Sequence, residues 1–287
     1  MKPPAFAYHD PETLEEAIAL LARLPNARAL AGGQSMMPML NMRFAQPDHL
    51  VDLNRIAGMD GVAVEADGAL LIGAMARQRV LERDAEVALR CPLMVEALAQ
   101  VGHRQTRNRG TIGGSLCHLD PAAELPLVAA VTEATVIVAG PSGRRELTFA
   151  DFAQGYMTPG IEQDELVVAV RVPAQTAMAG SCFIEFARRH GDFAIASVAV
   201  VLVPDAAGRI ASARIALGGV GAVPLRLPEA EALLCGAAAD DFPAVVAATA
   251  ALEPMEDALV PSWYRRHLAG VLLGRALKTA ASRMGRA

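Results

Sequence analysis

The chain is poor in aromatic residues and has no long apolar run. Only 4% of its 287 residues are aromatic although 53% are hydrophobic, so we expect an aliphatic core. No run of about 18 or more apolar residues occurs, which argues against a membrane-spanning helix. Residues 1–10 lack the basic and then apolar layout of a signal peptide. These absences predict a soluble, cytoplasmic protein.

Cysteine is scarce and scattered. Cys91, Cys117, Cys182 and Cys235 show no CxxC or similar spacing, which argues against a zinc or iron–sulfur site made by this chain alone. We therefore predict no metal site, and we expect reduced, buried thiols of the kind found in the cytoplasm.

Basic charge and the common catalytic motifs are also missing. The net charge of −5 argues against a nucleic-acid partner, which needs a basic face. No HExxH, GxSxG or paired-carboxylate motif occurs. Cys117 and His118 are neighbours, but neither has a companion at a spacing typical of nucleophilic catalysis. We therefore predict no catalytic residue in this chain.

Three sections follow one another, and together they predict an α+β fold. We place the boundaries at 1–56, 57–175 and 176–287, with residues 174–180 as a linker. Thr13 and Glu16 fit a capping box at the start of a helix with Leu14, Ala17, Ile18 and Leu21 at helical spacing. Further helices are predicted at 36–44, 93–101, 122–131, from 229 onward and at 261–284. Strands are predicted at 27–30, 49–53, 69–75, 135–139, 166–172, 182–187, 196–203 and 210–217, with a hairpin turn at 204–208.

Two short glycine segments are the most informative feature. One is Ala31-Gly32-Gly33-Gln34-Ser35, and the other is Thr111-Ile112-Gly113-Gly114-Ser115. Adjacent glycines have no Cβ to obstruct a ligand, and their N–H groups can converge on one point. That arrangement suits a diphosphate. Either segment alone is also compatible with a plain structural turn, but two such segments could grip one dinucleotide from both sides.

The flanking residues extend this pattern. A strand precedes AGGQS and a helix follows it, and later come RNRGTIGGSL and DPAAELP. With the opening Phe6-x-Tyr8 and Pro11, and with Arg188-Arg189-x-x-Asp192, the whole chain resembles the FAD-binding medium subunits of the molybdenum hydroxylases. The carbon monoxide dehydrogenase and xanthine dehydrogenase group is the reference.

This resemblance implies an FAD-binding fold of the vanillyl-alcohol oxidase (PCMH) type in two α/β subdomains, followed by a C-terminal α+β flavoprotein domain. It also implies which residues line the diphosphate. On one side these are Ala29, Leu30, Ala31, Gly32, Gly33, Gln34, Ser35 and Met36, and on the other Thr111, Ile112, Gly113, Gly114 and Ser115.

Several positions depart from the family pattern. Glu124 stands where the family usually has an aspartate that accepts hydrogen bonds from ribityl or ribose hydroxyls, and the alternative is a solvated helix charge. Phe193 stands where many relatives have a tyrosine beside the flavin, and the alternative is core packing. Ile184-Glu185 replaces a frequent lysine. Asp120 is interpreted as the N-cap of the helix that follows it, with Pro121 at the first helical position.

A basic run, His103, Arg104, Arg107 and Arg109, is placed at the end of the helix predicted at 93–101. Cations there complement the helix dipole, and part of the run could face a partner subunit.

By resemblance, the chain carries FAD that relays electrons. Substrate is hydroxylated at a molybdenum cofactor on a large subunit, electrons pass through [2Fe–2S] clusters on a small subunit, and the assembly is a dimer of heterotrimers. Two alternatives remain open. One is a self-contained FAD-dependent oxidoreductase of the same fold, and the other is a non-redox nucleotide-binding or assembly protein.

Overall fold

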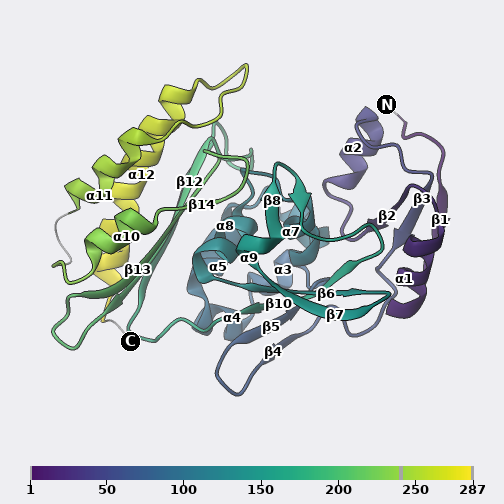
Figure 1. The fold of residues 1–287 in the computed structure, drawn as a ribbon, viewed down its shortest axis with the longest axis horizontal. Helices are drawn as coiled ribbons and strands as arrows, with labels where there is room; N and C mark the ends of the chain where they lie inside the picture. Colours follow the sequence, from purple (N-terminus) through teal and green to yellow (C-terminus); the bar gives the residue numbers. More distant parts are fainter. Residues whose placement is uncertain (1, 239–241, 286–287) are drawn as a thin grey trace.

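A computed structural model describes residues 2–238 and 242–285. Three sheets with their own helices lie in a row (Figure 1). The N-terminal unit is at one end, the C-terminal unit at the other, and the central unit between them. Helix and strand are mixed throughout, so the predicted α+β class is confirmed.

The N-terminal unit is a parallel three-stranded sheet in the order β1-β3-β2. Its elements are β1 (Ala7–His9), α1 (Leu14–Arg23), β2 (Ala27–Leu30), α2 (Met36–Met42) and β3 (His49–Asp52). The predicted capping box of α1 is confirmed. Thr13 Oγ1 accepts a hydrogen bond from the Glu16 N–H at 3.2 Å, and the Glu16 carboxylate accepts one from the Thr13 N–H.

The central unit is an antiparallel five-stranded sheet in the order β4-β5-β10-β6-β7. Its strands are β4 (Val62–Val64), β5 (Leu70–Gly73), β6 (Thr135–Gly140), β7 (Gly143–Thr148) and β10 (Leu166–Val172). Its other elements are α3 (Gln78–Leu81), α4 (Ala85–Arg90), α5 (Pro92–Gln100), α6 (Arg104–Arg109), α7 (Ile112–His118), α8 (Glu124–Thr132), α9 (Phe149–Phe152), β8 (Ala153–Gly155) and β9 (Thr158–Pro159).

The C-terminal unit is an antiparallel sheet in the order β11-β12-β13-β14. Its elements are β11 (Gly180–Phe186), β12 (Ala196–Pro204), β13 (Ile210–Gly218), β14 (Leu225–Arg226), α10 (Pro228–Leu234), α11 (Pro243–Ala247), the 3-10 turn η1 (Ala248–Ala251) and α12 (Ser262–Arg283). The predicted hairpin turn joins β12 to β13, where the Asp205 N–H donates to the Arg209 carbonyl at 2.7 Å.

The two faces of this sheet belong to different cores because side chains alternate along a strand. Phe183, Ala199 and Ala216 join the core of the central unit, whereas Val198 and Leu217 join the core under α12. One face therefore packs on the central unit and the other on the C-terminal helices.

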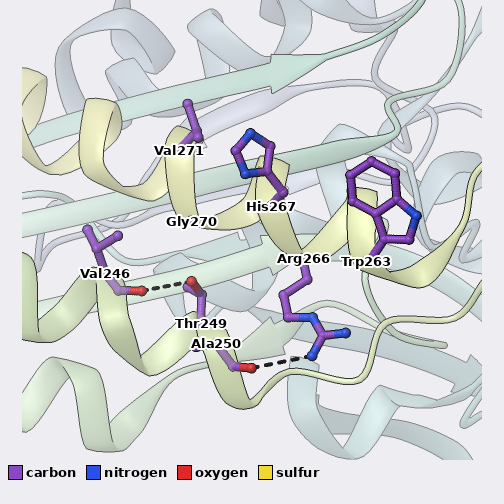
Figure 2. A pocket seen from close by; sticks show the side chains of 8 residues that line it. All are labelled: Val246, Thr249, Ala250, Trp263, Arg266, His267, Gly270 and Val271. Carbon is purple, nitrogen blue, oxygen red and sulfur yellow. Dashed lines mark hydrogen bonds between the residues drawn. The ribbon is translucent and has the colours of Figure 1, made fainter.

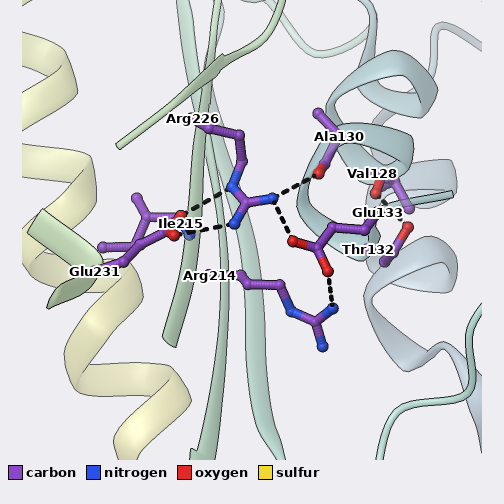
Figure 3. A network of polar contacts seen from close by, with 8 residues as sticks. All are labelled: Val128, Ala130, Thr132, Glu133, Arg214, Ile215, Arg226 and Glu231. Atoms are coloured by element: carbon purple, nitrogen blue, oxygen red, sulfur yellow. Dashed lines mark hydrogen bonds and ion pairs between the residues drawn. The ribbon is translucent and has the colours of Figure 1, made fainter. Parts of the chain in front are cut away.

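Helix α8 lies between the central unit and the C-terminal sheet. All of its residues are buried, and it packs on α5, β12 and β13. A helix that is apolar on every side belongs inside a protein. Beyond its last residue, Glu133 forms ion pairs with Arg214 and Arg226, and Arg226 also pairs with Glu231 (Figure 3). These contacts fasten the end of α8 to the C-terminal unit.

Two local predictions were wrong. The Asp120 side chain accepts the Ala122 N–H at 2.8 Å and so closes a turn, while α8 begins at Glu124 with Ala123 as its N-cap. The Gly219 N–H donates to the Pro121 carbonyl, which holds this turn against the end of β13 and delays the helix.

The basic run does not end the helix predicted at 93–101. That helix, α5, ends at Gln100. Gly102, with φ +45°, interrupts the helical conformation before the separate helix α6 begins. Arg107 is buried and donates to Glu82 through Nε at 3.0 Å. Arg107 therefore has a structural role, as the cation of a buried ion pair with Glu82.

Within the described residues, no helix is both long and apolar enough to cross a membrane.

Candidate functional site

The first glycine segment follows β2 and leads into α2. Across the ranges that the structure describes, the backbone N–H groups of residues 32 to 36 donate to no protein acceptor. Gly33 has φ +74°, a conformation that L side chains rarely adopt. A run of free amides beside a left-handed glycine is a concave anion-binding arrangement. It fits the diphosphate of a dinucleotide.

Two contacts hold this segment in place. The Leu53 N–H donates to the Leu30 carbonyl at 3.0 Å, and Asn54 Nδ2 donates to the Ala31 carbonyl at 3.0 Å. The carbonyls thus point toward the protein. Because Leu53 and Asn54 bind only the carbonyls, the N–H groups of the segment stay free for a ligand.

The second glycine segment is a helix start and not a loop. Thr111 is the N-cap of α7, and its Oγ1 accepts the Gly114 N–H at 3.1 Å. The Ile112 and Gly113 N–H groups donate to the carbonyls of Ala76 and Ala74. Since the N–H groups of residues 112 to 115 are engaged inside the protein, the run of free amides expected of both segments is found in the first and not in the second.

The two segments lie against each other although they are far apart in sequence. A β-carbon on Gly32 would lie 2.2 Å from the carbonyl oxygen of Arg109, just before the second segment. Arg77 Nη1 donates to that same oxygen at 2.5 Å, and the Arg77 guanidinium also contacts Asn54 Oδ1. Arg77 therefore connects the Arg109 backbone to Asn54, which binds the Ala31 backbone on the other side of the site, and it adds a positive charge near the site.

Sequence reasoning missed Asn54 and Arg77. Each lies close to a predicted strand end, Asn54 after residues 49–53 and Arg77 after 69–75. Polar residues that follow buried strands were the available signal.

Glu124 is buried, with 6% of its surface exposed, so a solvated helix charge is the wrong interpretation. Burial, with smaller contributions from the charges of Glu185 and Asp120, raises the pKa of its carboxyl to about 8. Glu185 lies on β11, where burial raises its pKa to about 7. Position 124 thus holds a carboxyl that retains its proton at neutral pH.

Phe193 is 63% exposed, which rules out core packing. It lies in the segment between β11 and β12, near α6, because the rings of His190 and His103 have centroids 6.4 Å apart. An exposed aromatic side chain here is available for stacking on a ligand.

The cysteines carry no reactive thiol in this region. All four are free, and burial raises the pKa of Cys91 and of Cys117 to about 12. Cys235 is exposed and Cys117 is only partly buried, so the expectation of buried thiols is confirmed for Cys91 and Cys182 alone. In the parts of the chain that are described, no group of three or more His, Cys, Asp or Glu side chains could hold a metal ion.

A separate groove of about 430 Å³ lies between α12 and η1 (Figure 2). Its polar contacts are internal. Thr249 Oγ1 donates to the Val246 carbonyl at 2.7 Å, and Arg266 donates to the Ala250 carbonyl at 3.5 Å. It shares no residue with the glycine segments.

Comparison with known proteins agrees with this arrangement. The family described as the FAD binding domain in molybdopterin dehydrogenase matches residues 4–175. The CO dehydrogenase flavoprotein C-terminal domain matches residues 181–280.

Individual relatives match over nearly their full length. The chain is 37% identical to the 6-hydroxypseudooxynicotine dehydrogenase complex subunit alpha of Paenarthrobacter nicotinovorans, over 99% of this chain and 97% of that protein. A structure of carbon monoxide dehydrogenase from Hydrogenophaga pseudoflava matches with a TM-score of 0.94 and 39% identity, over 99% of this chain and all of that one. Quinoline 2-oxidoreductase from Pseudomonas putida 86 matches with a TM-score of 0.92 and 36% identity, over 98% and 99%.

The fold and these matches define an FAD-binding oxidoreductase subunit with a PCMH-type FAD domain and a flavoprotein C-terminal domain. The chain belongs to the family of FAD-binding medium subunits of the molybdenum hydroxylases, as the resemblance implied.

Proposed function

We propose that this chain is the electron-relay subunit of a cytoplasmic molybdenum-dependent hydroxylase or dehydrogenase. It takes electrons from the [2Fe–2S] clusters of a small subunit and passes them to an external acceptor. A large subunit with the molybdenum cofactor converts the organic substrate. The observation that carries the proposal is the run of free amides from Gly32 to Met36 beside the second glycine segment.

These amides bind the FAD diphosphate by donating hydrogen bonds to its charged oxygens. Hydrogen bonds to charged groups contribute about 1.5–3 kcal/mol each, so several of them account for tight binding without a lysine cluster. The first segment supplies this set, with Ala29, Leu30 and Ala31 as the backbone support and Gln34 and Ser35 at the rim. Thr111, Ile112, Gly113, Gly114 and Ser115 form the opposite wall as the first turn of α7.

The chain also positions the rest of the cofactor. Glu124 presents a carboxyl to the ribityl or ribose hydroxyls, and Phe193 offers an aromatic face to the flavin ring. FAD supplies an acceptor that takes up one or two electrons. Cys117, with its raised pKa, stays protonated. We therefore propose that FAD is held without a covalent bond.

Partner subunits complete the reaction. The relatives are a subunit of a dehydrogenase complex and a medium chain, which supports an assembly of large, medium and small subunits. We propose a dimer of heterotrimers. The free cysteines support a reducing compartment.

The direct test is stopped-flow reduction of the flavin. With large and small subunits from the same gene neighbourhood, substrate should reduce the flavin rapidly. The isolated FAD-loaded chain should show no reduction by substrate. Rapid reduction of the isolated chain would instead support a self-contained oxidoreductase, and a purified chain that binds no flavin would support the non-redox alternative.

A further inference from the structure

The N-terminal unit lies at one end of the molecule and has few polar contacts with the rest of it (Figure 1). The ion pairs of Arg55 stay within the unit. Within the described residues, one hydrogen bond connects residues 2–56 with the remainder of the chain, and the Arg77 guanidinium donates it to Asn54 Oδ1. We call this hydrogen bond the Arg77–Asn54 bridge.

Apolar packing joins the two units where the chain passes from one to the other. Leu53 and Ile56 belong to the same buried core as Met59 and Ile72. Among the described elements, no helix or strand of the N-terminal unit packs extensively on a helix or strand of another unit. The orientation of the N-terminal unit therefore depends on contacts outside its helices and strands.

A second area of contact lies at the glycine segments themselves. A β-carbon on Gly32 would lie 2.2 Å from the Arg109 carbonyl oxygen, and a β-carbon on Gly114 would lie 3.5 Å from that of Ala31. Residues 31 and 32 belong to the N-terminal unit, whereas residues 109 and 114 belong to the central unit. The two walls of the candidate site are therefore also the surfaces on which the two units meet.

Arg77 reaches both walls from its position after β5. Its backbone forms an isolated antiparallel bridge with Thr111, so it lies beside the second glycine segment. Its Nη1 donates to the Arg109 carbonyl at 2.5 Å, and its Nη2 donates to Asn54. A guanidinium presents several N–H donors in a fixed planar fork, so one side chain can hold two acceptors at once.

Asn54 is oriented to accept this hydrogen bond. Its backbone N–H donates to Asp52 Oδ1 at 2.9 Å, and its Nδ2 donates to the Ala31 carbonyl at 3.0 Å. Asp52 in turn accepts the Tyr8 hydroxyl at 2.6 Å. These contacts already fix the Asn54 side chain with its oxygen left for Arg77, so formation of the bridge costs little conformational entropy.

The bridge completes a path of hydrogen bonds between the two glycine segments. The path runs from the Ala31 carbonyl through Asn54 and Arg77 to the Arg109 carbonyl. Carbonyl groups and side chains form it, and the N–H groups of residues 32–36 take no part. The path thus holds the two walls together without using the groups that suit a diphosphate.

We propose that Arg77 and Asn54 are positioning residues, which hold the N-terminal unit against the central unit in the flavin-free chain and so keep both walls of the FAD diphosphate site in place. The inference rests on the proposed function for the identity of the ligand. A ligand binds the fraction of molecules that has the competent arrangement, so its apparent Kd rises as that fraction falls. Loss of the bridge should lower this fraction, and bound FAD should restore it, because a ligand shifts the population toward the state that it binds.

A double-mutant cycle tests the bridge. FAD is titrated into the full chain stripped of flavin, with flavin fluorescence as the signal. Arg77→Ala should raise the Kd about two- to tenfold, the effect of one lost hydrogen bond. Asn54→Ala should raise it at least as much, because it also releases the Ala31 carbonyl. The double variant should resemble Asn54→Ala, since both changes remove one shared interaction, and additive effects would overturn the inference.

Two further variants separate position from charge. Arg144→Ala, on the exposed strand β7, removes the same charge from the central unit and should leave the Kd unchanged. Arg77→Lys keeps the positive charge but loses the planar fork, so it should recover little of the affinity that Arg77→Ala loses. Full recovery with lysine would assign the effect to charge alone and would overturn the positioning role.

Electron paramagnetic resonance measures the arrangement of the units directly. Spin labels at Glu15→Cys on α1 and Ala88→Cys on α4, both at exposed positions, report the distance between the units. The background carries Cys117→Ala and Cys235→Ala, because these two thiols are not buried. Without flavin, the labelled chain should give a narrow distance distribution, and adding Arg77→Ala should broaden it. FAD should make the broadened distribution narrow again.

A distribution that stays narrow in the flavin-free Arg77→Ala chain would overturn the inference and leave the proposed function intact. The proposed function has its own readout in the titration of the natural chain. A folded natural chain that binds no FAD would overturn that function, while the distances measured without flavin would still decide the role of Arg77.

Discussion

Gly32 lies so close to Arg109 that a β-carbon on residue 32 would stand 2.2 Å from the Arg109 carbonyl oxygen. This contact is between backbones, and neither partner can rotate away as a flexible side chain could. The two glycine segments are therefore registered against each other by a position that accepts only glycine.

Replacing Gly32 with alanine should separate the two segments. Overpacking against a backbone costs about 1–3 kcal/mol, and we expect a lower free energy of unfolding together with weaker FAD binding. Thermal unfolding and flavin fluorescence measure the two effects. Gly61→Ala is the matched control, because no atom lies within 4 Å of its β-carbon position. Unchanged FAD affinity in Gly32→Ala would contradict the placement of the diphosphate.

Phe193→Ala should weaken FAD binding and leave the flavin-free fold unchanged. The side chain is 63% exposed, so its removal opens no cavity, while an aromatic stacking contact contributes about 0.5–1.5 kcal/mol. That range corresponds to about a two- to tenfold increase in Kd. Trp263→Ala removes an aromatic side chain of similar exposure in the C-terminal unit and should not change the Kd. Equal effects of both variants would argue against stacking at Phe193.

Glu124 makes the fold less stable as the pH rises. Its pKa is raised from 4.5 to about 8 in the folded chain, so the folded state keeps a proton that the unfolded chain releases. Stability is therefore full below pH 4.5 and is lost progressively up to about pH 8. Glu124→Gln should raise the Tm of the flavin-free chain above that range and leave it unchanged below it. A Tm that is insensitive to Glu124→Gln at every pH would contradict the raised pKa.

Replacing Arg226 should lower the free energy of unfolding more than replacing its ion-pair partner Glu133. Glu133 is 59% exposed, and exposed ion pairs contribute about 0–1 kcal/mol, so Glu133→Gln should be mild. Arg226 is less exposed and also binds Glu231 and the Ala130 carbonyl (Figure 3). Arg226→Ala should therefore cost about 1–3 kcal/mol, since it leaves these acceptors without their donor. Chemical denaturation measures both, with the exposed Arg209→Ala as a control near zero.

Sequence patterns predicted the regular elements well where burial alone determines them. The strand predicted at 166–172 has both of its boundaries correct, and two residues sufficed to identify the capping box of α1. Short-range signals of this kind depend only on neighbouring residues. The helix at 104–109 was missed because it has no apolar face, and it is held instead by the distant partner Glu82.

The candidate site divides in the same way. The glycine segments were evident from sequence, but their unequal use of N–H groups depends on the carbonyls of Ala74 and Ala76, which follow β5. Glu185 had a signal, a charge inside an otherwise apolar strand, yet its position opposite the buried Ser197 arises only from strand register. Long-range packing of this kind is not encoded in local spacing.

Helix α8 begins at Glu124, in the candidate FAD site, and ends beside Glu133, which the C-terminal unit holds through two arginines. The number of residues in α8 consequently sets both the distance between Glu124 and Glu133 and the angle between their side chains around the helix axis. Each residue of an α-helix adds a rotation of about 100° and a rise of about 1.5 Å. A single insertion or deletion in this helix, even of alanine, would rotate the Glu124 side chain by about 100° relative to the ion pairs of Glu133, while every other residue of the candidate site kept its identity. We therefore expect α8 to tolerate changes of composition within its buried space better than changes of length.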